Sequence, residues 1–256
     1  MTAEQVLLVA HDGPVTTVTL NRPERLNAIG PETVAALDAA LDDLPPQNRV
    51  LVIAARGRAF SAGGDLTAIS TLAGDDALER FHASISAVLR RIELLPVPVV
   101  AAVNGITVAG GLELVAACDI AVAAESATFG DGHPRFGLLP GGGGSVRLPR
   151  RIGVTRAKYL MFTGESVPAA TMQAWGLVSR VVPDDALRPA VEELSGLLAA
   201  RSRDGLARMK DLIDTGLEST PDDALAREQV VVGEHTGSAD YHEGLAAFRE
   251  RRAPRW

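Results

Sequence analysis

The sequence lacks most of what a secreted or membrane protein needs. It has a single cysteine, Cys118, so no intrachain disulfide can form, and this favours a reducing compartment. The N-terminal segment MTAEQVLLVAHDG has no basic region before its short apolar run, unlike a signal peptide. No stretch approaches the roughly 18 apolar residues of a membrane span. We therefore expect a cytoplasmic protein with no membrane partner.

Other common functional signals are also missing. The net charge is -7 and no block of five like charges occurs, which disfavours a nucleic-acid partner because such proteins show a basic face. The histidines lack the paired spacing of zinc ligands, so we expect no metal. The run PGGGGS lacks the G-K-[ST] ending of a nucleotide-binding loop and predicts a close-packed turn, and no G-x-S-x-G elbow is present.

Strand and helix patterns alternate along most of the chain. Residues 15–20 alternate in polarity and residues 49–55 are apolar, so both segments are predicted strands. Apolar residues at helical spacing predict helices over 31–44 and 75–95. This alternation predicts an α/β fold.

The chain changes character after about residue 185, where the pattern becomes helical throughout. With 256 residues, 46% of them hydrophobic, the chain is large enough to bury a substantial core. We expect one main domain at residues 1–195 and a C-terminal helical segment at residues 196–256. That segment packs either on the core or on a neighbouring subunit.

Two segments share one form, in which an apolar strand leads through a turn of small residues into a helix. They are AFSAGGDL at 59–66 and NGITVAGGLEL at 104–114. Glycine permits close approach of the backbone, and the first N–H groups of a helix favour a negatively charged ligand. These glycines serve either tight turns alone or a site that presents backbone N–H groups.

Several motifs, in order along the chain, resemble those of the crotonase (enoyl-CoA hydratase/isomerase) superfamily. They are LNRPERLNAI at 20–29, AFSAGGDL at 59–66, NGITVAGGLELVAACDIAVA at 104–123, FGLLPGGGGSVRLPRRIG at 136–153 and SADYHEGLAAFRERRAPRW at 238–256. The resemblance implies a crotonase-type (ClpP/crotonase) spiral of strand–strand–helix repeats. It also implies that the C-terminal helices build homotrimers, often paired into hexamers.

The resemblance further implies an enzyme that acts on an acyl-CoA thioester, most simply an enoyl-CoA hydratase or isomerase. Coenzyme A would be part of the substrate, and no separate cofactor is implied. The oxyanion donors of the family match the backbone N–H groups of Gly64 and Gly110. Two such groups aimed at the thioester oxygen each stabilise the negative charge of an enolate by about 2–4 kcal/mol.

Glu113 is the first acid/base candidate. It lies three residues after Gly110, so on a helix its side chain returns to nearly the same face. The surrounding helix, predicted over 110–119, is almost wholly apolar, which should raise the pKa of the carboxyl group toward the range of a general base. The family's first catalytic glutamate matches this position. The alternative is a glutamate that only stabilises the helix dipole.

His133 is the second candidate, and here the sequence departs from the family. Hydratases of the family carry F-G-x-P-E, whereas this chain reads FGDGHP with His133 at the glutamate position. Histidine carries protons near neutral pH. The residue before Pro134 is pushed toward an extended conformation, which would point His133 and Asp131 to the same side. Asp131 would then orient or charge the imidazole.

This departure keeps other functions open. His133 is either a second proton carrier or only a polar pocket residue, with the chemistry left to Glu113. Besides hydration and isomerisation, the alternatives are acyl-CoA hydrolysis, decarboxylation or C–C bond cleavage. A catalytically weak acyl-CoA-binding protein is the alternative outside enzymes.

Coenzyme A needs phosphate, adenine and pantetheine contacts. Arg22 and Arg25 follow the first predicted strand and can meet phosphates, and the resemblance favours Arg25. The resemblance also implies that the backbone at Ala62, Asp65 and Leu66 frames the adenine and pantetheine. We expect residues 67–85 and 132–140 to form the wall of the acyl pocket, with the apolar side chains Ile69, Leu72, Phe81 and Phe136.

Overall fold

A six-stranded sheet forms the centre of the fold in the computed structural model, which describes residues 5–72 and 74–256. Its spatial order is β1–β2–β3–β5–β7–β10, and neighbouring strands are parallel apart from β1 and β2. The strands are β1 (Leu7–Asp12), β2 (Val15–Leu20), β3 (Val50–Ala55), β5 (Val99–Val103), β7 (Ile120–Ala124) and β10 (Arg180–Val182). The central strands are apolar throughout, as parallel strands covered on both faces require.

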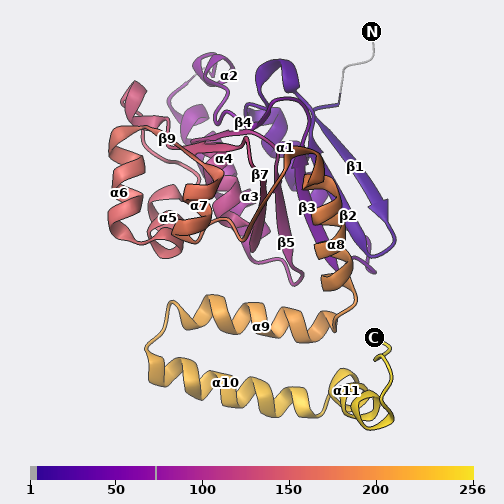
Figure 1. Cartoon of the computed structure of the whole chain (residues 1–256). Coiled ribbons are helices and arrows are strands. Elements are labelled where there is room, and N and C mark those ends of the chain that lie inside the picture. The colour runs from indigo at the N-terminus through magenta and orange to yellow at the C-terminus, as the bar shows by residue number, and fades with distance from the viewer. Residues whose placement is uncertain (1–4, 73) are drawn as a thin grey trace.

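Four short strands, which alternate along the chain with strands of the first sheet, form a second sheet (Figure 1). Its members are β4 (Ala59–Ser61), β6 (Ile106–Val108), β8 (Thr128–Gly130) and β9 (Ser166–Pro168), in that spatial order. The chain passes from β3 to β4, from β5 to β6 and from β7 to β8, and each time continues into a helix. The predicted α/β spiral of strand–strand–helix repeats is therefore confirmed.

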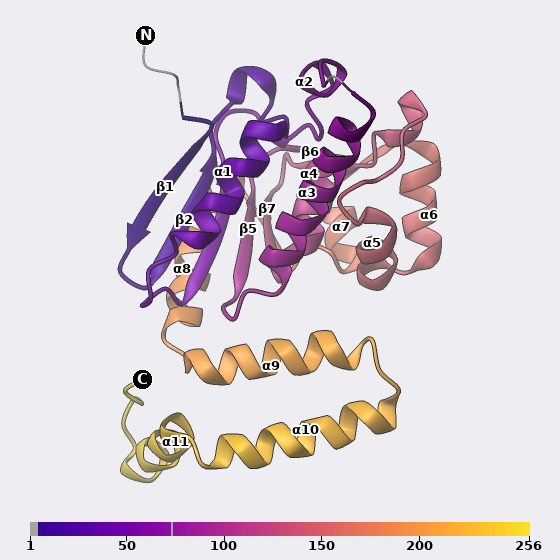
Figure 2. The same ribbon diagram turned by 180° about the vertical axis from the view of Figure 1, so that it is seen from behind.

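Helices cover both faces of the large sheet. On one face lie α1 (Pro31–Asp42), α3 (Asp75–Glu93) and α4 (Gly110–Ala117), and on the other lies α8 (Leu187–Ala199) (Figure 2). Strand β3 shows how one sequence serves both faces: Leu51 and Ile53 belong to the core under the first group, and Val50 and Val52 pack with α8. This alternation follows from the two-residue period of a strand.

The remaining helices of the core are shorter. They are α2 (Leu66–Ser70), α5 (Gly144–Ile152), α6 (Val154–Thr163), α7 (Ala169–Trp175) and the 3-10 turns η1 (Pro23–Arg25), η2 (His133–Phe136) and η3 (Asp184–Ala186). Gly153, with φ of +84°, separates α5 from α6. Within the described residues, no helix combines the length and apolar character that crossing a membrane would need. The expected cytoplasmic location stays a prediction.

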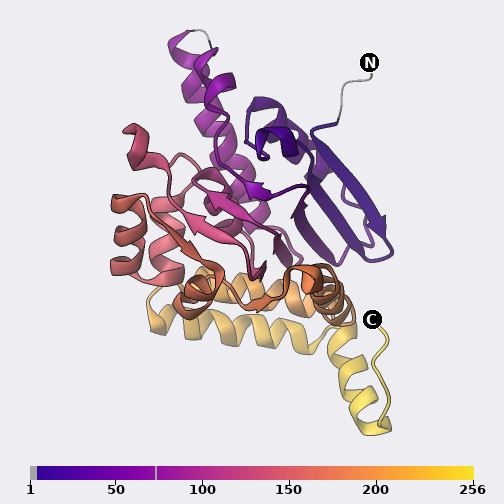
Figure 3. The same ribbon diagram turned by 45° about the horizontal axis from the view of Figure 1, so that its top comes forward.

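Three helices form the C-terminal segment: α9 (Arg203–Gly216), α10 (Pro221–Thr236) and α11 (Ala239–Glu250). They lie beyond the sheet, with α9 nearest to it (Figures 1 and 3). Lys210 of α9 donates to the carboxylate of Asp119 at 2.8 Å and to the carbonyl of Val97 at 3.3 Å. Asp119 and Val97 precede β7 and β5, so α9 covers the amino ends of the parallel strands. The predicted division at 195/196 falls inside α8 and stays a prediction.

Candidate active site

The candidate site lies at the end of the sheet opposite α9. Gly64 follows β4 and Gly110 begins α4, and both segments continue from the carboxyl ends of strands, where α/β folds bind ligands. A Cβ atom built on Gly110 would lie 3.6 Å from the backbone nitrogen of Gly64. The two predicted oxyanion donors are therefore neighbours.

Neither N–H group has a hydrogen-bond acceptor among the described residues. The N–H of Ile29 donates to Gly63 at 2.7 Å, and the N–H of Asp65 donates to Ile29 at 2.9 Å. Because N–H directions alternate along extended backbone, the N–H of Gly64 points away from Ile29. Gly110 is the first residue of α4, where an N–H group has no acceptor within the helix.

A strained turn holds these donors close together. Ala109 has φ of 49° and ψ of -116°, a combination that costs a residue with a side chain about 1–3 kcal/mol. Its N–H donates to the carbonyl of Gly130 at 3.1 Å, which fixes the turn. Gly63 has φ of +90°, and a Cβ there would lie 2.8 Å from the carbonyl oxygen of Val108. Glycine at position 63 thus lets the two backbone segments approach.

Asn27 fixes the strand that leads to Gly64. Its buried amide donates to the carbonyls of Arg56 and Ala59, both at 2.8 Å. The backbone carbonyl of Asn27 accepts a hydrogen bond from the hydroxyl of Ser61 at 2.9 Å, and that hydroxyl accepts one from the N–H of Gly63 at 3.2 Å. The sequence motif at 20–29 contains Asn27 and Arg22, whose N–H donates to the Asn27 side chain at 2.8 Å, but it does not reveal this role, because Arg56, Ala59 and Ser61 lie about thirty residues further along.

Glu113 is buried on α4, with 3% of its surface exposed. Its Oε1 accepts the N–H groups of Gly142 and Gly144, both at 2.8 Å. Among the described residues, no hydrogen bond reaches Oε2. Burial raises the pKa of Glu113 above its ordinary value, although the Gly144 N–H and the charge of His133 act in the opposite direction. This arrangement suits a proton acceptor with one fixed oxygen and one free oxygen.

The glycine run at 141–144, predicted only to form a close-packed turn, also supplies the N–H groups that bind Glu113. A Cβ on Gly142 would lie 2.8 Å from Oε2 of Glu113, and one on Gly144 would lie 3.2 Å from its Cγ. Only residues without side chains bring these N–H groups to the carboxylate without displacing it. The sequence does not reveal the two donors, because they are 29 and 31 residues from Glu113.

His133 and Asp131 form the pair that the sequence predicts. The imidazole Nδ1 lies 2.6 Å from Oδ1 of Asp131, and the same oxygen accepts the His133 backbone N–H at 2.9 Å. Burial lowers the pKa of His133, but the Asp131 hydrogen bond and the charges of Asp131 and Glu113 outweigh it, so the pKa is raised.

The predicted extended conformation at His133 is wrong. His133 begins η2, and Gly132 before it is helical, with φ of -83° and ψ of -10°. Pro134 stands in the first turn of η2, where its fixed φ suits a helix start. The pair forms because Asp131 binds the backbone and the ring of the same residue.

His133 lies in the same region as Glu113. The charge of each residue shifts the pKa of the other. A Cβ on Gly132 would lie 2.9 Å from Val108 and 4.0 Å from Ala109, so the His133 loop packs against the segment that leads to Gly110. The structure thus brings the predicted acid/base residues and oxyanion donors together.

Asp65 has a structural task in addition to its predicted backbone contact. Its carboxylate accepts the N–H of Ala68 at 3.1 Å and forms an ion pair with Arg22 at 3.0 Å. Burial raises the pKa of Asp65, but the Ala68 N–H and Arg22 outweigh it and lower the pKa. Arg22 therefore forms an ion pair within the protein, whereas the exposed Arg25 is the better candidate for a phosphate contact.

The other predicted coenzyme-binding residues lie on the same two segments as Arg22 and Asp65. Arg25 is exposed at the end of η1, and Leu66 is 45% exposed at the start of α2. Ala62 is half-buried, and its N–H donates to the carbonyl of Leu26 at 2.9 Å. Their role in coenzyme binding stays a prediction.

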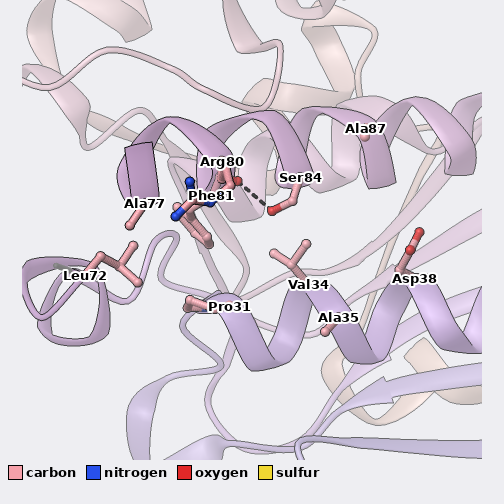
Figure 4. A pocket seen from close by; sticks show the side chains of 10 residues that line it. All are labelled: Pro31, Val34, Ala35, Asp38, Leu72, Ala77, Arg80, Phe81, Ser84 and Ala87. Atoms are coloured by element: carbon pink, nitrogen blue, oxygen red, sulfur yellow. Dashed lines mark hydrogen bonds between the residues drawn. The ribbon is translucent and has the colours of Figure 1, made fainter. Parts of the chain in front are cut away.

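A cavity of about 600 Å³ lies between α1 and α3 (Figure 4). Val34 of α1 and Phe81 and Ser84 of α3 face it, and Leu72 borders one end. Its lining contains Leu72 and Phe81 of the predicted acyl wall but neither Glu113 nor His133. Since the oxyanion donors do not line it either, we place the reaction centre at α4 and not in this cavity.

Similarity to known proteins extends over nearly the whole chain. The model of the enoyl-CoA hydratase/isomerase family matches residues 11–256. A protein named probable enoyl-CoA hydratase from Mycobacterium tuberculosis is 34% identical over 254 residues, which cover 98% of each chain. The 1,2-epoxyphenylacetyl-CoA isomerase of Escherichia coli is 35% identical over 94% of each chain. The crystal structure of an enoyl-CoA hydratase from Mycobacterium smegmatis superposes with a TM-score of 0.94 at 36% identity, covering 99% of each chain.

Proposed function

Because the chain belongs to the enoyl-CoA hydratase/isomerase family, we propose that it adds water to the double bond of an enoyl-CoA thioester. The observation that carries the proposal is the buried carboxylate of Glu113, held by Gly142 and Gly144 one helix turn from Gly110. The thioester oxygen lies at the N–H groups of Gly64 and Gly110. The proposal involves no metal or redox cofactor, since coenzyme A is part of the substrate.

Hydration begins with attack of a water oxygen on the β-carbon. Oε2 of Glu113 takes a proton from this water while the electron pair of the double bond moves between the α-carbon and the carbonyl carbon, and the carbonyl π pair moves onto the thioester oxygen. The negative charge of the resulting enolate is stabilised by the N–H groups of Gly64 and Gly110, by about 2–4 kcal/mol each.

His133 then donates a proton to the α-carbon, and the thioester carbonyl re-forms. The raised pKa of His133 supports this role, because the imidazole keeps its proton to a higher pH than free histidine. After one turnover Glu113 is protonated and His133 is neutral. Transfer of one proton from Glu113 to His133 through solvent restores the starting state.

Positional isomerisation of the double bond is the second candidate. It is favoured by the replacement of the family's second glutamate by the Asp131–His133 pair, and the family that the chain matches includes isomerases as well as hydratases. In that reaction a residue removes a proton from one carbon of the acyl chain. Either the same residue or a second one then supplies a proton to another carbon, and no water is added. The mass and double-bond position of the product distinguish both reactions from hydrolysis, decarboxylation, C–C cleavage and binding without turnover.

Coenzyme recognition is proposed at the exposed segments that carry Arg25 and Leu66. The guanidinium of Arg25 is accessible and suits a phosphate, and backbone groups of Ala62, Asp65 and Leu66 suit the adenine and pantetheine. A weaker affinity for coenzyme A in Arg25→Ala, with kcat unchanged, would support this assignment.

A homotrimer, alone or paired into a hexamer, is proposed from the C-terminal helices. Their exposed apolar side chains are Met209, Ile213, Leu217, Leu225, Val230, Val232, Leu245 and Phe248. Phe248 is 83% exposed, and such a set on three neighbouring helices favours burial against another copy of the chain. Light scattering coupled to size exclusion measures the mass directly, and a monomeric mass would contradict the proposal.

The catalytic assignment is tested by two substitutions. Glu113→Gln keeps an acceptor oxygen for the Gly142 and Gly144 N–H groups but cannot take a proton, so we expect kcat/KM for hydration to fall about 10²–10⁴-fold. His133→Ala should also lose activity if it donates the second proton. Glu125→Gln, an exposed control after β7, should leave the rate unchanged. Native rates in Glu113→Gln would refute the assignment.

A further inference from the structure

Arg147 lies behind the loop that holds Glu113. It stands in α5, and its Nη1 donates to the carbonyl of Gly142 at 2.6 Å. The N–H of the same Gly142 donates to Oε1 of Glu113 at 2.8 Å. One glycine therefore joins the guanidinium to the catalytic carboxylate.

Glu93 fixes the guanidinium in turn. Nη2 of Arg147 donates to Oε2 of Glu93, the last residue of α3, at 2.9 Å. The side chains are only 11% and 21% exposed. Burial raises the pKa of Glu93, but hydrogen bonds from Arg147 and Arg90 outweigh it and lower the pKa, so the carboxylate is charged at neutral pH. A charged, largely buried partner holds the planar guanidinium in one orientation.

The glycine loop depends on such outside contacts for its shape. Glycine has wide conformational freedom, so the run Gly141–Gly144 does not fix itself. Gly143 has φ of +93°, and a Cβ there would lie 2.3 Å from Nη1 of Arg147. The guanidinium thus occupies the space beside Gly143 and binds the carbonyl of Gly142. Among the described residues the buried Nε of Arg147 has no partner, so the arginine holds this place at some cost in stability.

We propose that Arg147, held by Glu93, is a positioning residue that sets Gly142 and so keeps Oε2 of Glu113 in its reactive position. Arg147 acts through Gly142, because among the described residues its side-chain hydrogen bonds go to that carbonyl and to Glu93. The inference rests on the proposed role of Glu113 as the base. It adds a requirement that the glycine motif alone does not contain.

Arg150 provides a matched control. It lies on the same helix and borders the same cavity of about 650 Å³ beneath α9 as Arg147 and Glu93. Its Nη1 donates to the carbonyl of Val146 at 2.9 Å, within its own helix, and not to the glycine loop. Arg150→Met therefore removes an arginine from this face without touching Gly142.

The kinetic test compares Arg147→Met, Arg147→Lys and Arg150→Met in the hydration assay. Because a misplaced catalytic group can lower the rate about 10²-fold, we expect kcat to fall about 10–100-fold in Arg147→Met with KM nearly unchanged. Lysine offers a point charge without the planar fork, so Arg147→Lys should recover only part of the rate. The proposal is overturned if Arg147→Met loses no more than Arg150→Met, or if KM and not kcat carries the change.

A second measurement needs no turnover. Amide hydrogen exchange reports on the N–H groups of Gly142 and Gly144, and we expect faster exchange in Arg147→Met and Glu93→Gln than in Arg150→Met. Thermal melting identifies a variant that fails to fold. If Arg147→Met fails to fold, hydrogen exchange is compared between Glu93→Gln and Arg150→Met. Faster exchange in a chain that hydrates no substrate would retain the positioning role and reject the proposed function. Unchanged exchange in folded Arg147→Met would reject the positioning role itself.

Discussion

Replacing Asp131 with asparagine tests how His133 is charged. The asparagine keeps the size of the side chain and an oxygen for the His133 backbone N–H, so the turn should survive. It removes the negative partner that lies 2.6 Å from the imidazole Nδ1. A hydrogen bond to a charged group contributes about 1.5–3 kcal/mol. The protonated imidazole loses this stabilisation in Asp131→Asn, so we expect the pKa of His133 to fall.

The sign of the effect on activity follows from the proposed roles. His133 must hold its proton to act as an acid, so kcat/KM falls as the pH rises through the pKa of His133, which the protein raises above 6.5. Glu113 must be ionised, so the rate also falls as the pH drops through its raised pKa. In Asp131→Asn the alkaline limb should move to lower pH, because the Asp131 hydrogen bond and charge raise the pKa of His133. The acid limb should move slightly the same way, because the charge of Asp131 raises the pKa of Glu113.

The assay follows loss of the conjugated enoyl thioester across the acidic to alkaline range, with kcat/KM taken at each pH. His133→Gln is the companion variant, and it should lose the alkaline limb while keeping the acid limb. An alkaline limb at the native position in folded Asp131→Asn would show that Asp131 does not set the charge of His133. An alkaline limb that persists in His133→Gln would assign it to another group.

Three further outcomes are expected. Asn27→Ala removes three side-chain hydrogen bonds and places alanine at φ of 53°, so the free energy of unfolding measured in urea should fall by about 2–5 kcal/mol. Gly142→Ala puts a Cβ 2.8 Å from the free oxygen of the buried glutamate, so kcat should fall at least about tenfold, with a smaller effect from Gly233→Ala, where a Cβ meets nothing within 4 Å. Lys210→Met leaves the carboxylate of Asp119 without its 2.8 Å partner, so hydrogen exchange in α9 should quicken and stability should fall by about 2–4 kcal/mol.

Much of the fold was predictable because its signals are local. The apolar strand at 49–55 and the helical spacing at 31–44 and 75–95 depend on neighbouring residues, and the structure places β3, α1 and α3 there. The family motifs then supplied the spiral arrangement, which periodicity alone does not give. The burial of Glu113 also followed from its own apolar helix.

The remainder depends on contacts between distant segments. Gly142 reaches Glu113 across 29 residues, and Arg147 reaches Glu93 across 54. Neither the spacing of apolar residues nor helix and strand propensity predicts contacts between residues so far apart in the sequence. At His133 two local rules competed: the residue before proline is disfavoured in helix, yet proline favours a helix start, and the Asp131 hydrogen bonds decided for the turn.

The most direct test of the account is the mass of the product formed from a panel of enoyl-CoA thioesters. The account predicts the gain of one water with the thioester intact, lost in Glu113→Gln. A product of unchanged mass with a moved double bond would favour the isomerase, and free coenzyme A would indicate a hydrolase. Binding of the whole panel, confirmed by calorimetry, with no change in mass would contradict the proposed hydration.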